Sequence, residues 1–159
     1  WAFRQIPRTF RYSMAAIIAL AHDLLIVISI TALIAKIMPF EISSMYLVGL
    51  LTVLGYSVND TIVVFDRLRE NILKGVTKDF VTTVNFSILE TLGRSLNTSL
   101  TTLLVLAALI FLGPESTKPF IIVLTIGVIS GTYSSLFIAS QLIVSWETRS
   151  LGKVSGSDT

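Results

Sequence analysis

The sequence predicts an all-α membrane protein, a polytopic bundle of transmembrane helices, and three observations support this fold class. Of the 159 residues, 53% are hydrophobic, and the mean hydropathy is +0.81. Only 14% are charged, whereas soluble domains carry about 25%. Several apolar runs are each long enough to cross a hydrocarbon core of about 30 Å. The composition therefore excludes a soluble globular domain.

Each apolar run is expected to form one transmembrane helix, and short turns marked by Pro39 and Pro114 separate the first from the second and the third from the fourth. The expected transmembrane helices are residues 12–37, 44–66, 95–113 and 119–146. Residues 147–159 are expected to form a polar, disordered cytoplasmic tail.

The first residues, 1–11, are expected to hold the cytoplasmic end of a preceding span and a linker. Trp1–Arg4 is apolar at its start and lacks the features of a signal peptide. We therefore expect the sequence to begin partway through a longer subunit.

The longest connection, residues 67–94, is expected to be a cytoplasmic loop that contains an amphipathic helix. Gly75 ends the preceding helix, and the Thr77 hydroxyl can cap the next one. Apolar residues follow at three- and four-residue spacing from Phe80 to Leu92. This spacing is typical of a helix that lies on the membrane surface or against the bundle.

Positive charge sets the predicted orientation. All of the 12 lysines and arginines except Lys36 and Lys118 fall on one side of this topology. Because cytoplasmic loops carry the excess of basic residues, both termini and the 67–94 loop are expected in the cytoplasm.

Metal and cofactor chemistry has little support in the sequence. Cysteine is absent, which excludes disulfides and thiolate metal sites, and His22 is the one histidine. We therefore expect no enzyme, no metal, no cofactor and no nucleic-acid partner, with protons as the coupling ion.

One acid, Asp60, lies beside Asn59 inside an apolar segment. An acid in hydrocarbon costs roughly 2.5–3.5 kcal/mol and usually marks a functional site. At 1.5 Å per residue, Asp60 lies about 9 Å inside the boundary expected at Asp66. Arg94 opens the third run at the same side, so the two side chains could pair. Breaking and making that pair would release and bind a proton, while the arginine stays charged.

A second acid, Asp23, follows His22 and lies about 18 Å from the inner boundary, near mid-membrane. Two acids at different depths could form a stepped proton path. A hydrogen bond between helices explains Asp23 equally well. Structural roles also stay open for Asp60, as a tie between helices, and for Arg94, as a boundary arginine whose head group reaches water.

Polar or small side chains recur at helical spacing on three runs, and we expect these faces to meet. They are Gly49, Thr52, Tyr56, Asn59 and Asp60; Arg94, Asn97, Thr98, Thr101 and Thr102; and Gly127, Gly131 and Ser135, with Ser130 and Ser134 beside them. The expected supporting residues of the proton path are Asp23, His22, Asn59, Tyr56, Asn97 and Thr98. Gly127, Gly131 and Ser135 are expected to pack helices together.

Residues 55–71, GYSVNDTIVVFDRLREN, resemble the signature of the SecF family, the smaller membrane subunits of the SecD–SecF accessory complex of bacterial protein translocation. Ala19–Asp23 and Thr91–Ser99 resemble the same family, and Gly127–Ser135 fits its last helix. The resemblance covers about residues 5–147, nearly the whole sequence.

The resemblance implies half of a resistance-nodulation-division type transmembrane domain, in which six-helix halves from SecD and SecF pair as pseudo-symmetric repeats. It assigns proton flow to Asp60 and Arg94, and this flow would help to draw preproteins across the cytoplasmic (inner) membrane. The implied partners are SecD, the SecY–SecE–SecG channel, membrane lipids and, indirectly, SecA and the preprotein. The family's first span and extracytoplasmic domain have no counterpart in the sequence, so these residues alone are expected to bind or conduct protons without pulling a substrate.

Two other functions stay open. One is a proton-driven exporter of lipids or small molecules from the same superfamily, which should contain a substrate-sized cavity. The other is a passive assembly subunit of the translocon, in which Asp60 and Arg94 only hold helices together.

Overall fold

The computed structural model describes residues 9–37, 42–77 and 79–155, with the side chains of residues 149–155 outside the description. Over this part of the chain every regular element is helical: α1 (Thr9–Ile37), α2 (Ser44–Lys74), α3 (Phe80–Leu112), the 3-10 turn η1 (Glu115–Thr117), α4 (Lys118–Tyr133), the π-helical turn η2 (Ser134–Ala139) and α5 (Ser140–Ser155). Four helical stretches, the last of which joins η1 to α5, have the length and composition to cross a membrane. The predicted all-helical fold class is confirmed. Residues 1–8, 38–41 and 156–159, for which a linker, a turn and part of the tail were expected, lie outside the described residues.

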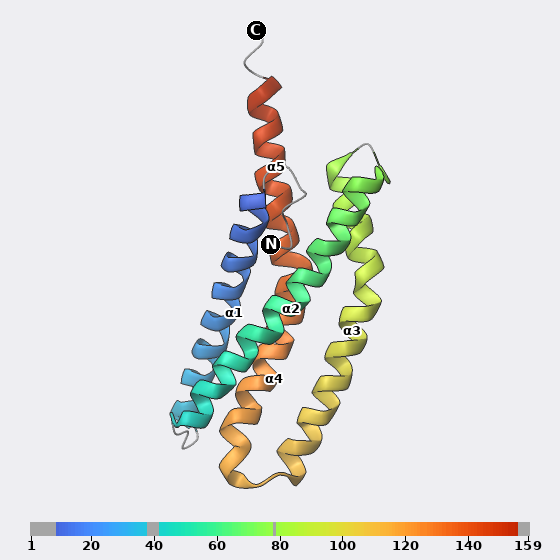
Figure 1. Ribbon diagram of the computed structural model, residues 1–159. Helices are drawn as coiled ribbons and strands as arrows, with labels where there is room; N and C mark the ends of the chain where they lie inside the picture. The colour runs from blue at the N-terminus through green and yellow to red at the C-terminus, as the bar shows by residue number, and fades with distance from the viewer. Residues whose placement is uncertain (1–8, 38–41, 78, 156–159) are drawn as a thin grey trace.

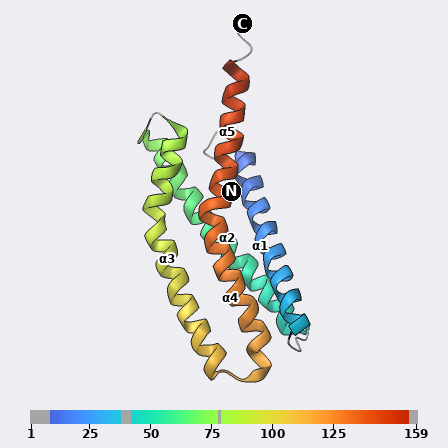
Figure 2. The ribbon, with the colours of Figure 1, turned by 180° about the vertical axis from the view of Figure 1, so that it is seen from behind.

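Helices α2 and α4 form the centre of the bundle, because they contact each other and each also contacts α1 and α3. α1 and α3 flank α4 on opposite sides, and α2 crosses it (Figures 1 and 2). The end of α1, the start of α2 and η1 lie at one end of the bundle (Figure 1). The start of α1, the α2–α3 turn and α5 lie at the other end, and α5 projects beyond the remaining helices. The direction of the chain thus alternates as expected for consecutive spans.

Within the expected connection at 67–94, the end of α2 before Gly75 agrees with the prediction, and the boundary that differs is the one expected between residues 94 and 95. α2 continues to Lys74, and the expected amphipathic helix and the third apolar run form the single helix α3. Gly93 does not break α3, because an isolated glycine with no neighbouring proline is tolerated inside a helix. The last helix also continues through α5 to Ser155, so the tail expected from residue 147 begins as helix.

Gly75 and Asp79 set the turn between α2 and α3. Gly75 ends α2 with φ 62° and ψ 40°, a left-handed conformation that glycine adopts without steric cost. The Asp79 carboxylate caps α3 by accepting a hydrogen bond from the Thr82 amide at 2.9 Å. The prediction of Thr77 as the cap was wrong, because Asp79 directly precedes the first helical residue. The Thr77 hydroxyl instead donates to the Asp79 carbonyl at 2.8 Å.

We predict that this cap weakens at acid pH. Bonds from the Thr82 hydroxyl and amide hold the pKa of Asp79 below its ordinary value of 3.8. A lowered carboxyl pKa means that the cap is fully effective above pH 3.8 and is lost as the pH falls further. Hydrogen exchange of the Thr82 amide should be severalfold faster in Asp79→Ala than in wild type at pH 6, and the difference should vanish at strongly acid pH. An equal difference at both pH values would contradict the prediction.

Ion pairs tie the ends of α2 and α3 together next to this turn. The Arg67 guanidinium donates to both oxygens of Glu90 at 2.7 Å each, and also to Glu70 at 2.5 Å. The Asn71 amide donates to Ser87 at 2.9 Å and to Glu90 at 2.7 Å. The polar residues at the end of α2 therefore join it to the first turns of α3 and do not only face solvent.

Apolar clusters fill the bundle on both sides of a polar middle layer. The cluster nearer the α2–α3 turn contains Tyr12, Ala15, Ala19, Val64, Phe65, Leu68, Val84, Leu136, Ala139 and Ile143. Those nearer the opposite end contain Val27, Tyr46, Val53 and Val123, and Leu106, Ile121 and Val128. Asp23 on α1 lies between Ala19 and Val27, so it belongs to the layer between the clusters.

We predict that the contact between α4 and α2 is intolerant of added volume at Gly127. A Cβ atom at Gly127 would lie 2.1 Å from Cγ2 of Val53, whereas one at Gly131 would lie 3.4 Å from Cβ of Ser57. Gly127→Ala should therefore lower the free energy of unfolding by about 1–3 kcal/mol, the usual cost of overpacking. Gly131→Ala is the matched control and should cost much less. Unfolding of the purified subunit in mixed detergent measures both, and equal losses would refute the prediction.

Candidate functional site

Asp23 lies at the centre of a cage of hydrogen-bond donors. Its side chain is fully buried, at 0% exposure. Oδ2 accepts hydrogen bonds from Ser57 at 2.5 Å and from Ser134 at 2.6 Å. Oδ1 accepts one from Ser130 at 3.0 Å and lies 3.2 Å from Nδ1 of His22. These contacts join α1 to α2, α4 and η2, so the acid fixes several helices at one level.

Asp60 lies in the same layer with fewer partners. Oδ1 accepts a hydrogen bond from the Ser95 hydroxyl of α3 at 2.9 Å, and Oδ2 accepts a short one from the Ser135 hydroxyl of η2. A carboxylate has about four acceptor positions, so the described residues fill half of them. Asp60 is half-buried. The remaining acceptor positions of this carboxylate are therefore free of contacts from the described residues.

Arg94 does not pair with Asp60 in this conformation, so an ion pair that is made and broken in turn stays a prediction. Within the described ranges no hydrogen bond or salt bridge joins the two, and Arg94 is exposed. Its neighbour Ser95 makes the contact instead. Consecutive side chains on an α-helix point about 100° apart, so only one of the two can face α2.

Three of the expected supporting residues point away from the layer. The exposed ones are Asn59, Asn97 and Thr98. Tyr56 does face the bundle, where its hydroxyl lies 3.1 Å from the Ser99 hydroxyl. The Ser99 hydroxyl in turn lies 2.5 Å from that of Thr132. This second polar cluster joins α2, α3 and α4.

The turn η2 brings the two acids into contact with adjacent residues. Ser134 donates to Asp23 and Ser135 donates to Asp60, and both serines are buried. The expectation for Ser135 was helix packing, whereas its hydroxyl contacts the acid directly. π-Helical turns are rare and occur frequently at functional sites. The hydroxyl groups that contact the two acids therefore belong to consecutive residues of η2.

Four hydroxyl-bearing residues around the two acids had no predicted role: Ser57, Ser95, Ser99 and Thr132. The spacing of Ser57, four residues after Val53 and so on the same face of α2, could have indicated that it is buried. No comparable signal distinguishes Ser95 from the polar residues around it.

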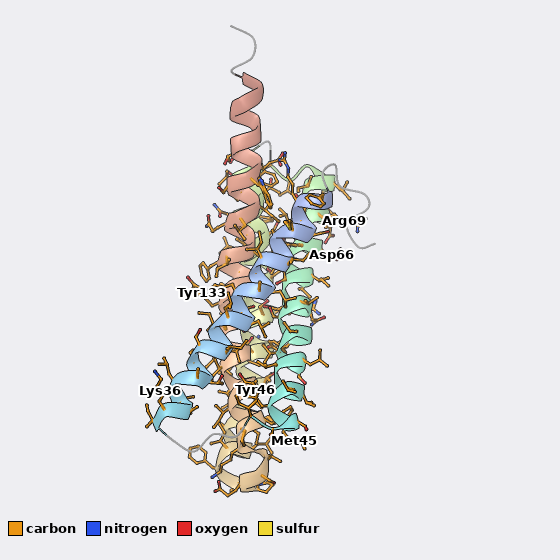
Figure 3. The ribbon with its side chains drawn as sticks, turned by 90° about the vertical axis from the view of Figure 1, so that its left-hand side faces the viewer. Lys36, Met45, Tyr46, Asp66, Arg69 and Tyr133 are labelled. Carbon is orange, nitrogen blue, oxygen red and sulfur yellow. The ribbon has the colours of Figure 1, made fainter. Side chains whose placement is uncertain are left out.

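A cavity of about 330 Å³ adjoins the layer between α1 and α4. It is lined mainly by isoleucines, with His22, Ser130 and Tyr133 as its polar members. Tyr133 lies about midway along the bundle (Figure 3). A larger cavity of about 470 Å³ between α3 and α4 is lined largely by leucine and aromatic side chains. Among the described residues, no group of three or more His, Cys, Asp or Glu side chains could hold a metal ion.

Comparison with known protein families places residues 6–149 in the family described as Protein export membrane protein SecD/SecF, C-terminal. The protein translocase subunit SecF of Thermobaculum terrenum is 50% identical over 149 residues, which are 94% of this chain and 47% of that protein. SecF of Anaerolinea thermophila is 43% identical over 93% of this chain and 48% of its own length. The chain thus spans about half the length of these relatives.

Solved structures show the same arrangement of helices. A crystal structure of SecDF in a super-membrane-facing form matches with a TM-score of 0.84 and 39% identity, over 93% of this chain and 20% of that one. A crystal structure of SecDF from Thermus thermophilus, described as a translocon-associated membrane protein, matches with a TM-score of 0.75 and 40% identity. The match covers 87% of this chain and 19% of that one.

Proposed function

Because this chain belongs to the SecD/SecF family of protein export membrane proteins, we propose that it is the proton-coupled membrane part of a SecF-type translocase subunit. It uses the proton gradient to assist export of preproteins across the cytoplasmic membrane. SecD is its immediate partner, and the SecY–SecE–SecG channel, SecA and the preprotein are its wider partners. The basic residues at the termini and around the α2–α3 turn support a cytoplasmic location for that end of the bundle.

The observation that carries this proposal is the incomplete set of donors at Asp60. Two neutral hydroxyls, from Ser95 and Ser135, contact the carboxylate. When Asp60 is ionised, both serines donate to it. When it binds a proton, the carboxyl group loses its negative charge and becomes a donor, so the hydrogen bonds that it accepts from the two serines weaken or change direction. Because the serines belong to α3 and η2, protonation changes how three helices are joined.

Arg94 has a different role in this mechanism. It precedes Ser95 on α3. A rotation of α3, or an inward turn of the long Arg94 side chain, therefore replaces the Ser95 hydroxyl at Asp60 with the Arg94 guanidinium. A guanidinium stays charged and favours the ionised acid. Arg94 therefore promotes proton release in one state and is turned away in the other, which is the state of this structure.

The proposal is tested by preprotein export into inverted inner-membrane vesicles. Vesicles carry SecD with the full-length subunit that contains this sequence, or lack that subunit, and export is measured with and without an uncoupler. The uncoupler-sensitive part of export should require the subunit. An equal uncoupler-sensitive part in both vesicles would refute the proposal. The translocase name of the relatives favours this function over export of lipids or small molecules.

A further inference from the structure

We propose that His22 and Asp23 form a second proton-binding site, in which Nε2 of His22 takes up the proton from the cavity between α1 and α4. This inference rests on the proposed proton-coupled function and adds a site to it. It is supported by the donors around Asp23, the charge balance of the layer, the tautomer of the imidazole and the access that the cavity gives.

The donors around Asp23 fit an ionised carboxylate. Each oxygen has two contacts, from Ser57 and Ser134 at Oδ2 and from Ser130 and His22 at Oδ1. A carboxylate offers about four acceptor positions, all of which are occupied here. A proton on Asp23 would require one of these hydroxyls to turn and accept a hydrogen bond. The ionised carboxylate fits the cage without such a change.

A fully buried anion needs a positive partner. The lysine and arginine side chains within the described ranges make no salt bridge to Asp23, and His22 is the one titratable group in contact with it. Tyr133 on α4 lines the same cavity as His22, and Asp60 on α2 contacts the serine next to Ser134; neither supplies positive charge. A protonated His22 makes the pair neutral, which lowers the cost of Asp23 in the apolar bundle.

The contact at Oδ1 also selects the tautomer. An ionised carboxylate has no hydrogen to donate, so Nδ1 of His22 must carry one for the 3.2 Å contact to be a hydrogen bond. In neutral His22 the other ring nitrogen, Nε2, is then bare. Nε2 is therefore the atom that gains the proton, and Asp23 orients the ring and stabilises the resulting imidazolium.

The cavity gives this ring access from outside the buried cage. His22 is 37% exposed, whereas Asp23 is completely buried behind it. His22 and Ser130 both line the 330 Å³ cavity, and both also contact Oδ1 of Asp23. A proton entering the cavity meets the imidazole before the acid.

The test is nitrogen NMR of the full-length subunit with SecD in lipid nanodiscs, labelled with ¹⁵N-histidine. The resonances missing from His22→Gln belong to His22. At high pH the wild-type ring should be the Nδ1–H tautomer, and it should become doubly protonated as the pH falls. In Asp23→Asn the new amide can donate to Nδ1, so the Nε2–H tautomer of His22 should appear at high pH. Asp66→Asn removes a 71% exposed acid on α2 and should leave the tautomer unchanged.

An Nε2–H tautomer in wild type at high pH, or a tautomer unchanged in Asp23→Asn, would overturn the inference. The tautomer is measured on wild type alone, so a variant that fails to fold does not remove the test. The measurement uses neither a gradient nor a preprotein, so its result is independent of the export assay.

Discussion

Replacing Asp60 by asparagine is expected to reduce preprotein export to the level measured with an uncoupler, while the complex still assembles. Asparagine keeps the size of the side chain and can accept from one serine and donate to the other, so the contacts to Ser95 and Ser135 can persist. It cannot bind and release a proton. The change that protonation makes in the hydrogen bonds between α2, α3 and η2 is therefore lost, and with it the coupling to the gradient.

The export assay in inverted vesicles measures this effect, and recovery of SecD with the purified subunit checks assembly. Asp66→Asn is the matched control, because the same substitution is made six residues further along α2 at a side chain that is 71% exposed. It should leave uncoupler-sensitive export intact. If Asp60→Asn assembles and keeps that part of export, Asp60 serves only to tie helices together.

Replacing Asp23 by alanine is expected to be the most destabilising change in the polar layer. It removes hydrogen bonds from Ser57, Ser130 and Ser134, which join α1 to α2, α4 and η2. At roughly 0.6 kcal/mol for each interhelical bond in a membrane, and with buried hydroxyls left without an acceptor, the loss is about 2 kcal/mol or more. Unfolding of the purified subunit in mixed detergent should show this loss.

Asp23→Asn separates the hydrogen bonds of this residue from its charge. The serine hydroxyls can rotate to accept from the amide nitrogen, so most of the cage survives and the loss of stability should be clearly smaller than for alanine. Asn59→Ala, at an exposed position of α2, should have little effect. Equal losses for Asp23→Ala and Asp23→Asn would mean that the cage contributes little to stability.

Much of the fold could be predicted because a long apolar run has one stable solution in a membrane, a helix. The boundaries were less predictable. The amphipathic pattern from Phe80 and the apolar run from Ser95 differ in composition, yet one continuous set of backbone hydrogen bonds spans both. Composition indicates where a helix meets water or lipid, and it does not indicate where the helix ends.

Both acids of the site could be predicted, since a carboxylate inside an apolar run stands out in any sequence. Their partners could not, because a partner depends on which face of each helix meets its neighbours. Arg94 and Ser95 are adjacent, and the choice between them is made by the rotation of α3 against α2. The charge of Arg94 favoured it as the partner of Asp60, whereas Ser95 makes the contact in this conformation.

The buried face of α2 illustrates the same difficulty. It passes through Gly49, Val53, Ser57 and Val64 at spacings of about one or two turns, and it is mostly apolar. A search for polar residues follows a different line, through Thr52 and Asn59, both of which are exposed. Packing of small and apolar side chains, not polarity, determines which hydroxyls enter the layer.

The π-helical turn has a consequence for insertions and deletions in this helix. A turn closed by bonds to the fifth residue contains one residue more than an α-helical turn. Gly127 before it and Ile143 after it each face the bundle, so the surplus residue is absorbed within residues 134–139. Removing one exposed residue of that turn, such as Phe137, would convert it to ordinary α-helix and leave both flanks in phase. Removing one residue anywhere else in α4 or α5 would turn one flank away from its neighbours.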